Sequence, residues 1–167
     1  MRQPGPVRIH AVDYRAAQDA ADVCTLLDVY ARDPMGGGEP LAAEVLGRLC
    51  GDLAARADAF SFLAYVDVGH PKAVGLINCF EGYSTFKARP LLNIHDIVVH
   101  PDYRGAGVGH ALLGAAQDVA RARGCCKLTL EVLSGNAVAA RSYARFGFAA
   151  YQLDPAAGQA VLMQKWL

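Results

Sequence analysis

The most constraining feature of the sequence is a glycine-rich turn that joins an apolar strand to an amphipathic helix. A strand is predicted over Leu91–His100, and a helix over Gly107–Arg123. Three alternating glycines stand between and at the start of these elements: Gly105, Gly107 and Gly109. Glycine lets the backbone approach a ligand closely, and a helix N-terminus presents unpaired N–H groups with a partial positive charge. The turn is therefore predicted to bind an anion, most naturally a phosphate or pyrophosphate.

Two well-known phosphate-binding patterns do not fit this turn. A Walker loop needs a lysine followed by a hydroxyl residue, and the turn has none. A dinucleotide fingerprint counted from Gly105 would need a glycine where His110 stands. A third pattern, [R/Q]xxGxG, is met by Arg104, Gly107 and Gly109, and Arg104 is expected to add a positive charge at the mouth of the site.

The other segments predict an α/β fold in one domain over residues 1–167. Hydrophobic spacing and turn residues indicate these elements: strands at Val7–Val12, Phe60–Val68, Val74–Glu81, Lys127–Leu133, Phe148–Leu153 and Ala160–Trp166, and helices at Ala16–Ala31, from about Pro40, and at Ala137–Arg145. This order implies a mixed sheet with helices on both faces. The strand–helix–strand run from Leu91 to Leu133 is expected to form a parallel crossover, because its two strands are joined through a helix.

Composition argues against several classes of partner. The 16 Lys and Arg residues balance the 16 Asp and Glu residues, so the basic surplus typical of a nucleic-acid-binding protein is missing. No apolar run is long enough for a membrane helix, and no secretory signal is visible. The five cysteines lack metal-ligand spacing, which favours reduced thiols in a cytoplasmic protein with no metal.

A second block of residues agrees with the glycine-rich turn. Residues Asn136–Phe148 match the spacing NxxAxxxYxxxGF and follow a predicted strand. With both motifs in this order, the sequence resembles the GNAT superfamily of N-acetyltransferases over about residues 60–153. The diamine and polyamine branch and the ribosomal-protein branch are the most similar. The resemblance implies a mostly antiparallel, six- to seven-stranded mixed sheet, with a central pair of parallel strands that splay apart.

The resemblance also implies acetyl-CoA as co-substrate, and it implies which residues would hold it. The strand residues would bond the pantetheine arm through the backbone, and the turn would hold the pyrophosphate by main-chain N–H groups. Asn136 would contact pantetheine or cap the next helix, a role for which asparagine is well suited. The expected coenzyme-binding residues are Ile97, Val98, Val99, Arg104, Gly105, Ala106, Gly107, Val108, Gly109, His110 and Asn136.

Two candidates for proton transfer come from the family resemblance. Tyr143 matches the tyrosine that protonates the departing CoA thiolate, although its helical spacing with Phe146 also fits a packing role. Glu131 stands five residues before Asn136, where the ribosomal-protein acetyltransferases carry their base. A solvated strand residue is an equally good interpretation of Glu131.

Two further candidates, His95 and Asp96, interrupt an apolar strand. Strand alternation sends neighbouring side chains to opposite faces, so the two are expected to serve different purposes. Burying such groups is costly unless they are bonded, which points to function or to a partner. A histidine can act as a base near neutral pH, although a core histidine bonded to the backbone fits equally well. The polyamine branch has an acidic residue where His95 stands, which weakens a polyamine assignment.

The identity of the amine is left open by the sequence. Specificity is expected from the loops at Asp33–Glu39 and Gly82–Pro90, whose charges and aromatic rings suit a second amine, a substrate carboxylate or plain solvent exposure. These residues are Glu39, Glu81, Tyr83, Phe86, Lys87 and Arg89. A small-molecule diamine, an amino acid and a protein N-terminus or lysine all stay open as acceptors.

A non-catalytic sensor that binds acetyl-CoA is the main rival to an enzyme. Retention of Tyr143 and Glu131 argues against it. Pairing of edge strands between two copies would give a homodimer, a common state in the family.

Overall fold

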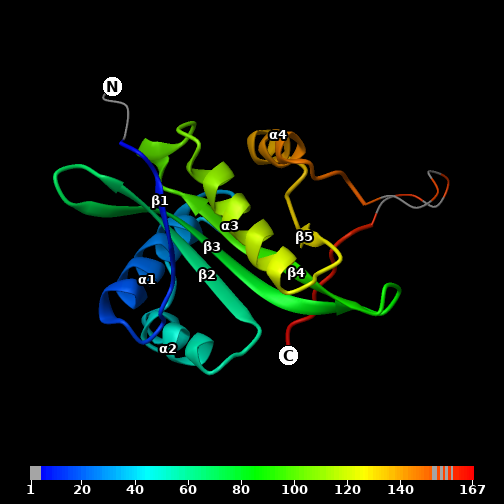
Figure 1. The fold of residues 1–167 in the computed structure, drawn as a ribbon, viewed down its shortest axis with the longest axis horizontal. Coiled ribbons are helices and arrows are strands. Elements are labelled where there is room, and N and C mark those ends of the chain that lie inside the picture. Colours follow the sequence, from blue (N-terminus) through cyan, green and yellow to red (C-terminus); the bar gives the residue numbers. More distant parts are fainter. Residues whose placement is uncertain (1–4, 152–153, 155, 157, 159) are drawn as a thin grey trace. The chain divides into compact units, whose positions relative to one another are not determined.

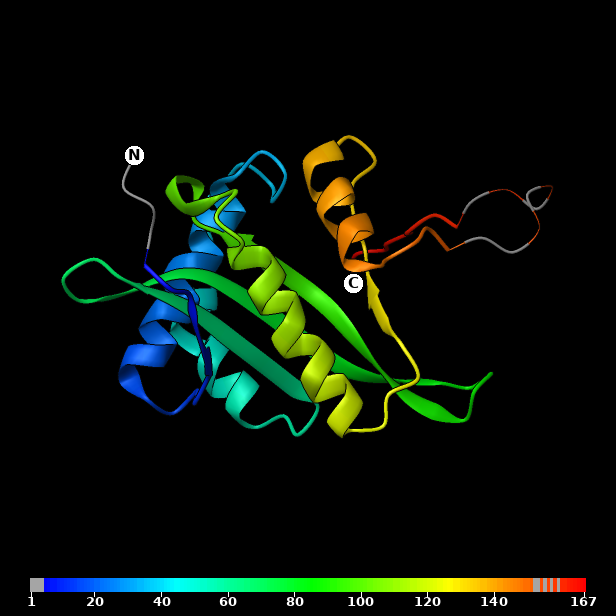
Figure 2. The same ribbon diagram turned by 45° about the horizontal axis from the view of Figure 1, so that its top comes forward.

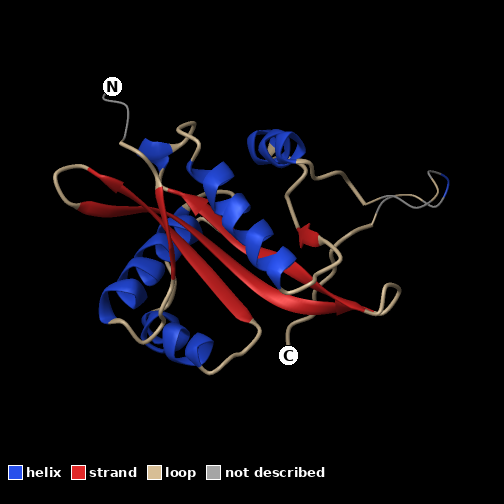
Figure 3. Ribbon diagram, in the orientation of Figure 1, coloured by secondary structure: helices blue, strands red, loops and turns tan. Residues whose placement is uncertain are grey.

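A five-stranded mixed sheet is the centre of the computed structural model (Figure 1; Figure 3). Its strands run in the order β1-β2-β3-β4-β5, and they are Arg8–Ala11, Ala59–Asp67, Pro71–Ser84, Arg89–Val99 and Leu128–Leu130. All neighbouring pairs are antiparallel except β4 and β5, which are parallel. The predicted parallel crossover between β4 and β5 is therefore confirmed.

The structure describes residues 5–151, 154, 156, 158 and 160–167. The chain divides into two compact units, Met1–Leu130 and Glu131–Leu167. The first unit contains the whole sheet, the helices α1 (Ala17–Arg32), α2 (Ala43–Ala54) and α3 (Val108–Ala122), and a short 3₁₀ helix at Pro101–Tyr103. The second contains α4 (Ala137–Phe146). That all 167 residues act as one domain stays a prediction.

Helices cover both faces of the sheet in the first unit (Figure 2). Leu76 of β3 belongs to the core cluster formed with Val23 and Leu26 of α1. A Cβ added at the neighbouring Gly75 would instead lie 2.8 Å from Val108 of α3. Because successive strand residues face opposite sides, α1 and α3 lie on opposite faces. Gly75 has no side chain where Val108 and Leu112 of α3 pack against β3.

The helices begin and end close to the predicted residues, except at the start of α2. The helix expected from about Pro40 begins at Ala43. The N–H of Leu41 donates to the Asp28 carboxylate at 2.8 Å, so this segment is tied to α1 before the helix starts. Hydrogen bonds from Arg32 and then from Leu41 lower the pKa of Asp28, as expected for a carboxylate that accepts two donors.

The two closing strands are not confirmed. Residues 148–151 and 160–167 lie outside helices and strands, and residues 152, 153 and 159 lie outside the described residues. The strand expected at Lys127–Leu133 is also shorter, because β5 ends at Leu130 and Glu131 is exposed beyond it. The sheet of the described residues thus has five strands rather than the expected six or seven.

Candidate active site

The glycine-rich turn forms an open, glycine-lined entry to α3. Gly105 and Gly107 have φ values of +79° and +82°, a left-handed conformation that strains any side chain but suits glycine. Gly107 is the N-cap of α3, so the N–H groups of the first helical turn lack intrahelical acceptors. A Cβ at either glycine would meet no protein atom within 4 Å. The turn can therefore admit a ligand close to its backbone, as a diphosphate requires.

The last residues of β4, which lead into this turn, do not pair with the parallel strand β5. Pairing between β4 and β5 covers Leu92, Asn93 and Ile94 only. On the other side, Val99 still pairs with Gly75 of β3. The stretch Ile97–Val99 thus runs past the end of β5 and pairs with no residue of that strand. Its contact with a pantetheine arm stays a prediction.

Arg104 is engaged within the protein. Its guanidinium donates to the Val99 carbonyl at 3.2 Å and to the Asp33 carboxylate at 2.8 Å. A hydrogen bond from the Met35 N–H, followed by that from Arg104, lowers the pKa of Asp33. The predicted positive charge is therefore present, but it is paired with Asp33 in the loop that follows α1. Arg104 thus links the glycine-rich turn to that loop.

A pocket of about 350 Å³ lies between α1, α2 and the sheet. Its wall is mostly apolar, with one group of polar residues on β3 and β4. The lining residues are Leu27, Tyr30, Ala31, Gly36, Leu41, Leu49, Leu53, Asn78, Phe80, His95 and Asp96. Gly36 is needed here because a Cβ would overlap the Tyr30 carbonyl.

His95 and Asp96 share this pocket, which corrects the expectation that they face opposite sides. The register of β3 against β4 pairs Asn78 with Asp96 and Cys79 with Ile94, so His95 is an extra residue, a β-bulge. A bulge breaks the two-residue alternation and redirects the side chain beside it. The His95 ring packs edge-on against Phe80 at 5.5 Å and is exposed, so it is not a core histidine.

Asp96 ends a row of hydrogen-bonded side chains that crosses three strands. Ser61 of β2 donates to the Asn78 Oδ1 at 2.6 Å, and the Asn78 Nδ2 donates to the Asp96 carboxylate at 3.0 Å. Tyr14 lies 2.7 Å from the Ser61 hydroxyl and must donate to it, because the only Ser61 hydrogen is used by Asn78. Burial, the larger cause, raises the pKa of Tyr14, so the phenol keeps this proton.

Tyr30 lines the pocket within electrostatic reach of two carboxylates, Asp96 and Asp33. Burial raises the pKa of Tyr30 most, followed by the negative charges of Asp96 and Asp33. Asp33 has Arg104 as its ionic partner. Among the described residues no ion pair joins a cation to Asp96, which is therefore the uncompensated carboxylate of the pocket wall.

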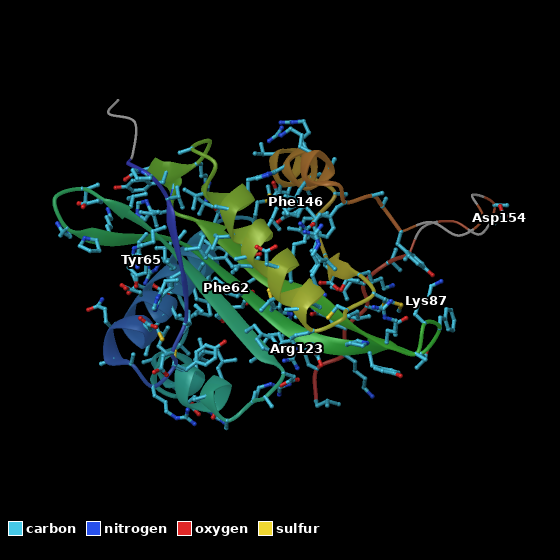
Figure 4. The ribbon with its side chains drawn as sticks, viewed as in Figure 1. Phe62, Tyr65, Lys87, Arg123, Phe146 and Asp154 are labelled. Carbon is cyan, nitrogen blue, oxygen red and sulfur yellow. The ribbon has the colours of Figure 1, made fainter. Side chains whose placement is uncertain are left out.

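The expected specificity loop at Gly82–Pro90 is mostly strand. Within it, Arg89 donates twice to the Gly124 carbonyl, and the preceding residue Glu81 pairs with Arg123. Lys87 lies at the turn of the β3–β4 hairpin (Figure 4), beside the 94% exposed Phe86. None of the residues from Gly82 to Pro90 lines the pocket described above.

The second unit carries the remaining candidates. Asn136 is the N-cap of α4 and accepts from the Ala139 N–H at 3.1 Å, so its capping role is confirmed while its contact with pantetheine stays a prediction. Tyr143 is half-buried on α4, 6.0 Å from the Phe148 ring. Glu131 is exposed outside β5. The acid role of Tyr143 and the base role of Glu131 stay predictions.

Among the residues that the structure describes, no cluster of three or more potential ligands is placed to hold a metal ion. Within the same residues, no helix combines the length and hydropathy that a bilayer crossing requires. All five cysteines are free thiols, and burial raises the pKa of Cys79 to about 12.

Comparison with known proteins agrees with this geometry. The sequence model of the acetyltransferase (GNAT) family matches residues 25–148, which include the whole glycine-rich turn and all of α4. The chain belongs to this GNAT family. Acetyl-CoA is the donor that the family uses, and the expected membership of the GNAT family of N-acetyltransferases is thereby confirmed.

Curated relatives of this GNAT chain are acetyltransferases of different small molecules. Streptothricin acetyltransferase of Streptomyces lavendulae is 47% identical over 74 residues, 44% of this chain and 38% of the relative. Thialysine N-epsilon-acetyltransferase of Bos taurus is 38% identical over 77 residues, 46% of this chain and 45% of the relative. The match thus spans less than half the length of either relative.

Solved GNAT structures share the fold of the chain at low sequence identity. AAC(6')-Iy, in complex with a bisubstrate analog of CoA and acetylneamine, has a TM-score of 0.77 at 15% identity and covers 98% of this chain and 100% of its own. Ribosomal-protein-alanine N-acetyltransferase from Brucella melitensis has a TM-score of 0.70 at 21% identity, covering 96% and 100%.

Several residues of the site were not predicted from the sequence. Asn78 and Ser61 connect Asp96 to Tyr14, and Tyr30 lines the pocket. One signal was available: Asn78 and Ser61 are polar residues inside strongly apolar strands, the same signal that singled out His95 and Asp96.

Proposed function

We propose that the chain transfers the acetyl group of acetyl-CoA to the primary amine of a small molecule, by direct attack in a ternary complex. The observation that supports this most is the pairing of the open glycine turn of α3 with a separate pocket on the other face of β4. The glycine turn suits an anionic coenzyme, and the pocket suits a small ligand. A pocket of this volume lies near the lower end of the range for small-molecule sites, about 300–1,000 Å³.

The donor half of the reaction is assigned to the turn and the end of β4. Main-chain N–H groups over Gly105–His110 would bind the diphosphate, and backbone groups of Ile97, Val98 and Val99 would align the pantetheine arm. Coenzyme binding then supplies the activated thioester. Arg104 would strengthen diphosphate binding, either from its position beside Asp33 or after leaving that carboxylate.

The chemical step needs an acid and a base. An acceptor ammonium must lose a proton before its nitrogen can form a bond to the thioester carbonyl carbon, and the carbon–sulfur bond then breaks. The departing thiolate takes a proton, for which Tyr143 is the proposed donor. The nitrogen loses two protons in all: one leaves through the base to water, and the other restores the hydroxyl of Tyr143. Products and reactants balance as an amide, a thiol and one released proton.

The candidate bases are Glu131, His95 and Asp96, and paired variants will separate the first two. We expect His95→Ala to lower kcat by about 10²-fold, the usual value of a general base, and to change the shape of the pH profile. His95 is expected to act because it lines the acceptor pocket. Glu131→Gln serves as the comparison. A normal rate and pH profile in His95→Ala, with loss of rate in Glu131→Gln, would move the base role to Glu131.

A thiol-release assay with a panel of primary amines tests the proposed function itself. Acetyl-CoA and the protein are mixed with mono- and diamines, amino sugars, amino acids and a lysine-containing peptide, and free CoA thiol is measured with time. Amine-dependent release with at least one small amine is expected. Tight CoA binding without release for any acceptor would indicate the sensor alternative, and release with the peptide alone would indicate a protein acetyltransferase.

The wider assignments belong to the same proposal. Residues 1–167 are taken as one acetyl-CoA-binding domain, and its partner as a small-molecule amine rather than nucleic acid or a membrane. The homodimer and the cytoplasmic location expected from the sequence stay predictions.

A further inference from the structure

The pocket beside Asp96 has the chemistry of one particular class of amine. Seven of its lining residues are leucine, alanine, glycine or phenylalanine: Leu27, Ala31, Gly36, Leu41, Leu49, Leu53 and Phe80. The polar atoms come from the other four, Tyr30, Asn78, His95 and Asp96. A ligand that fits this wall therefore needs an apolar body and a polar group at one end.

The charge on this wall is a single carboxylate. Asp33, the other carboxylate that acts on Tyr30, is already held by Arg104 at 2.8 Å. Asp96 receives only the neutral amide of Asn78 among the described hydrogen bonds. One uncompensated carboxylate matches one ammonium, and a second buried cation would face leucine side chains without a partner.

The row of hydrogen bonds behind Asp96 fixes it as an acceptor. Tyr14, Ser61 and Asn78 all donate in the same direction, towards the carboxylate. With the Asn78 amide reversed, its oxygen would face an Asp96 oxygen, and two acceptors would meet unless Asp96 held a proton. The row also fixes the position of the carboxylate, because Ser61 and Asn78 are buried and packed within the sheet.

From these contacts we propose that the acceptor is a primary amine with one positive charge and an apolar body, whose ammonium Asp96 binds and whose hydrocarbon part lies against α1, α2 and Phe80. Asn78 is a positioning residue in this proposal, since it acts through Asp96. The proposal rests on the proposed function, because it names the acceptor of that same reaction. It disfavours polyhydroxylated and multiply charged amines, whose extra polar groups would be buried without partners.

The first test compares four matched probes: hexylamine, 1-hexanol, 1,6-diaminohexane and glucosamine. The kcat/KM for hexylamine is expected to exceed that for the diamine and the amino sugar by about tenfold or more, the scale of one unpaired polar group. 1-Hexanol, which lacks the charge, is expected to inhibit weakly. Equal or better turnover of glucosamine or the diamine would overturn the proposed class while leaving the acetyltransferase activity intact.

The second test removes the carboxylate charge and its support. Asp96→Asn is expected to raise the KM for hexylamine about tenfold or more, as loss of a charge-assisted hydrogen bond implies. Asp118→Asn, an exposed site on α3, is the matched control and should leave the KM unchanged. Asn78→Leu should raise the KM in the native protein and add nothing in the Asp96→Asn background. Additive effects of the two changes would show that Asn78 does not act through Asp96.

Two readouts keep the proposal testable if a variant or the reaction fails. Tyr14→Phe weakens the same row from its far end, so it replaces Asn78→Leu if that variant does not fold. Hexylamine binding can be followed without turnover through the NMR signals of the Asn78 side-chain amide. Saturable shifts that vanish in Asp96→Asn would support the pocket even if no amine were acetylated, and absence of shifts in the native protein would contradict it.

Discussion

Gly109→Val is expected to weaken CoA binding by about 30-fold or more, which corresponds to about 2 kcal/mol. Gly109 is the second residue of α3, two positions after the left-handed Gly107, where the proposed diphosphate must approach the backbone. A Cβ at this position would lie 3.7 Å from Val99, an ordinary contact, so the fold should tolerate the change. Loss of affinity would then come from the ligand rather than from the protein. Isothermal titration calorimetry with CoA measures it.

The same helix provides a matched control. Gly114 also lies in α3, and a Cβ there would meet no atom within 4 Å. Gly114→Val should bind CoA with native affinity, and its free energy of unfolding should stay the same or rise slightly because valine is a better helix former than glycine. Equal CoA affinity in the native protein and Gly109→Val would remove the diphosphate from this turn.

Tyr143→Phe is expected to lower the rate of acetyl transfer by about 10²-fold or more, the usual value of a positioned acid. The change removes only the hydroxyl, so the ring contact with Phe148 should persist. Affinity for CoA should change little, because the hydroxyl is proposed to act on the thiolate that forms during the reaction. Single-turnover measurements separate this chemical step from product release.

Tyr151→Phe is the control for the acid. Tyr151 is exposed and, like Tyr143, belongs to the unit Glu131–Leu167. The Tyr151→Phe variant should transfer acetyl groups at the native rate. A native single-turnover rate in Tyr143→Phe would exclude the acid role and leave Tyr143 as a packing residue of α4.

The elements nearest the coenzyme turn were the most predictable from sequence. Local signals determine them: glycines at fixed spacing, helical periodicity after Gly107, and an asparagine cap before α4. The predicted bounds of α3 and α4 differ from the observed ones by a single residue at each end, apart from the exact start of α4. These features depend on neighbours in the chain, so no tertiary information was required.

The acceptor pocket was the least predictable part. The bulge at His95 depends on how β3 pairs with β4, and strand register is set by contacts between distant residues. The same holds for the bond between Arg104 and Asp33, which are 71 positions apart. Strand alternation alone therefore predicted His95 and Asp96 on opposite faces, whereas in the folded sheet both line one pocket.

The backbone of the glycine-rich turn is the proposed diphosphate site, and one NMR titration tests this directly. Backbone ¹H–¹⁵N signals are followed while CoA is added, and again with pantetheine, which lacks the diphosphate. We expect saturable shifts of the Gly105, Gly107 and Gly109 amides with CoA and much smaller ones with pantetheine. Unmoved glycine signals while CoA saturates another region, or no saturable change at all, would contradict the account.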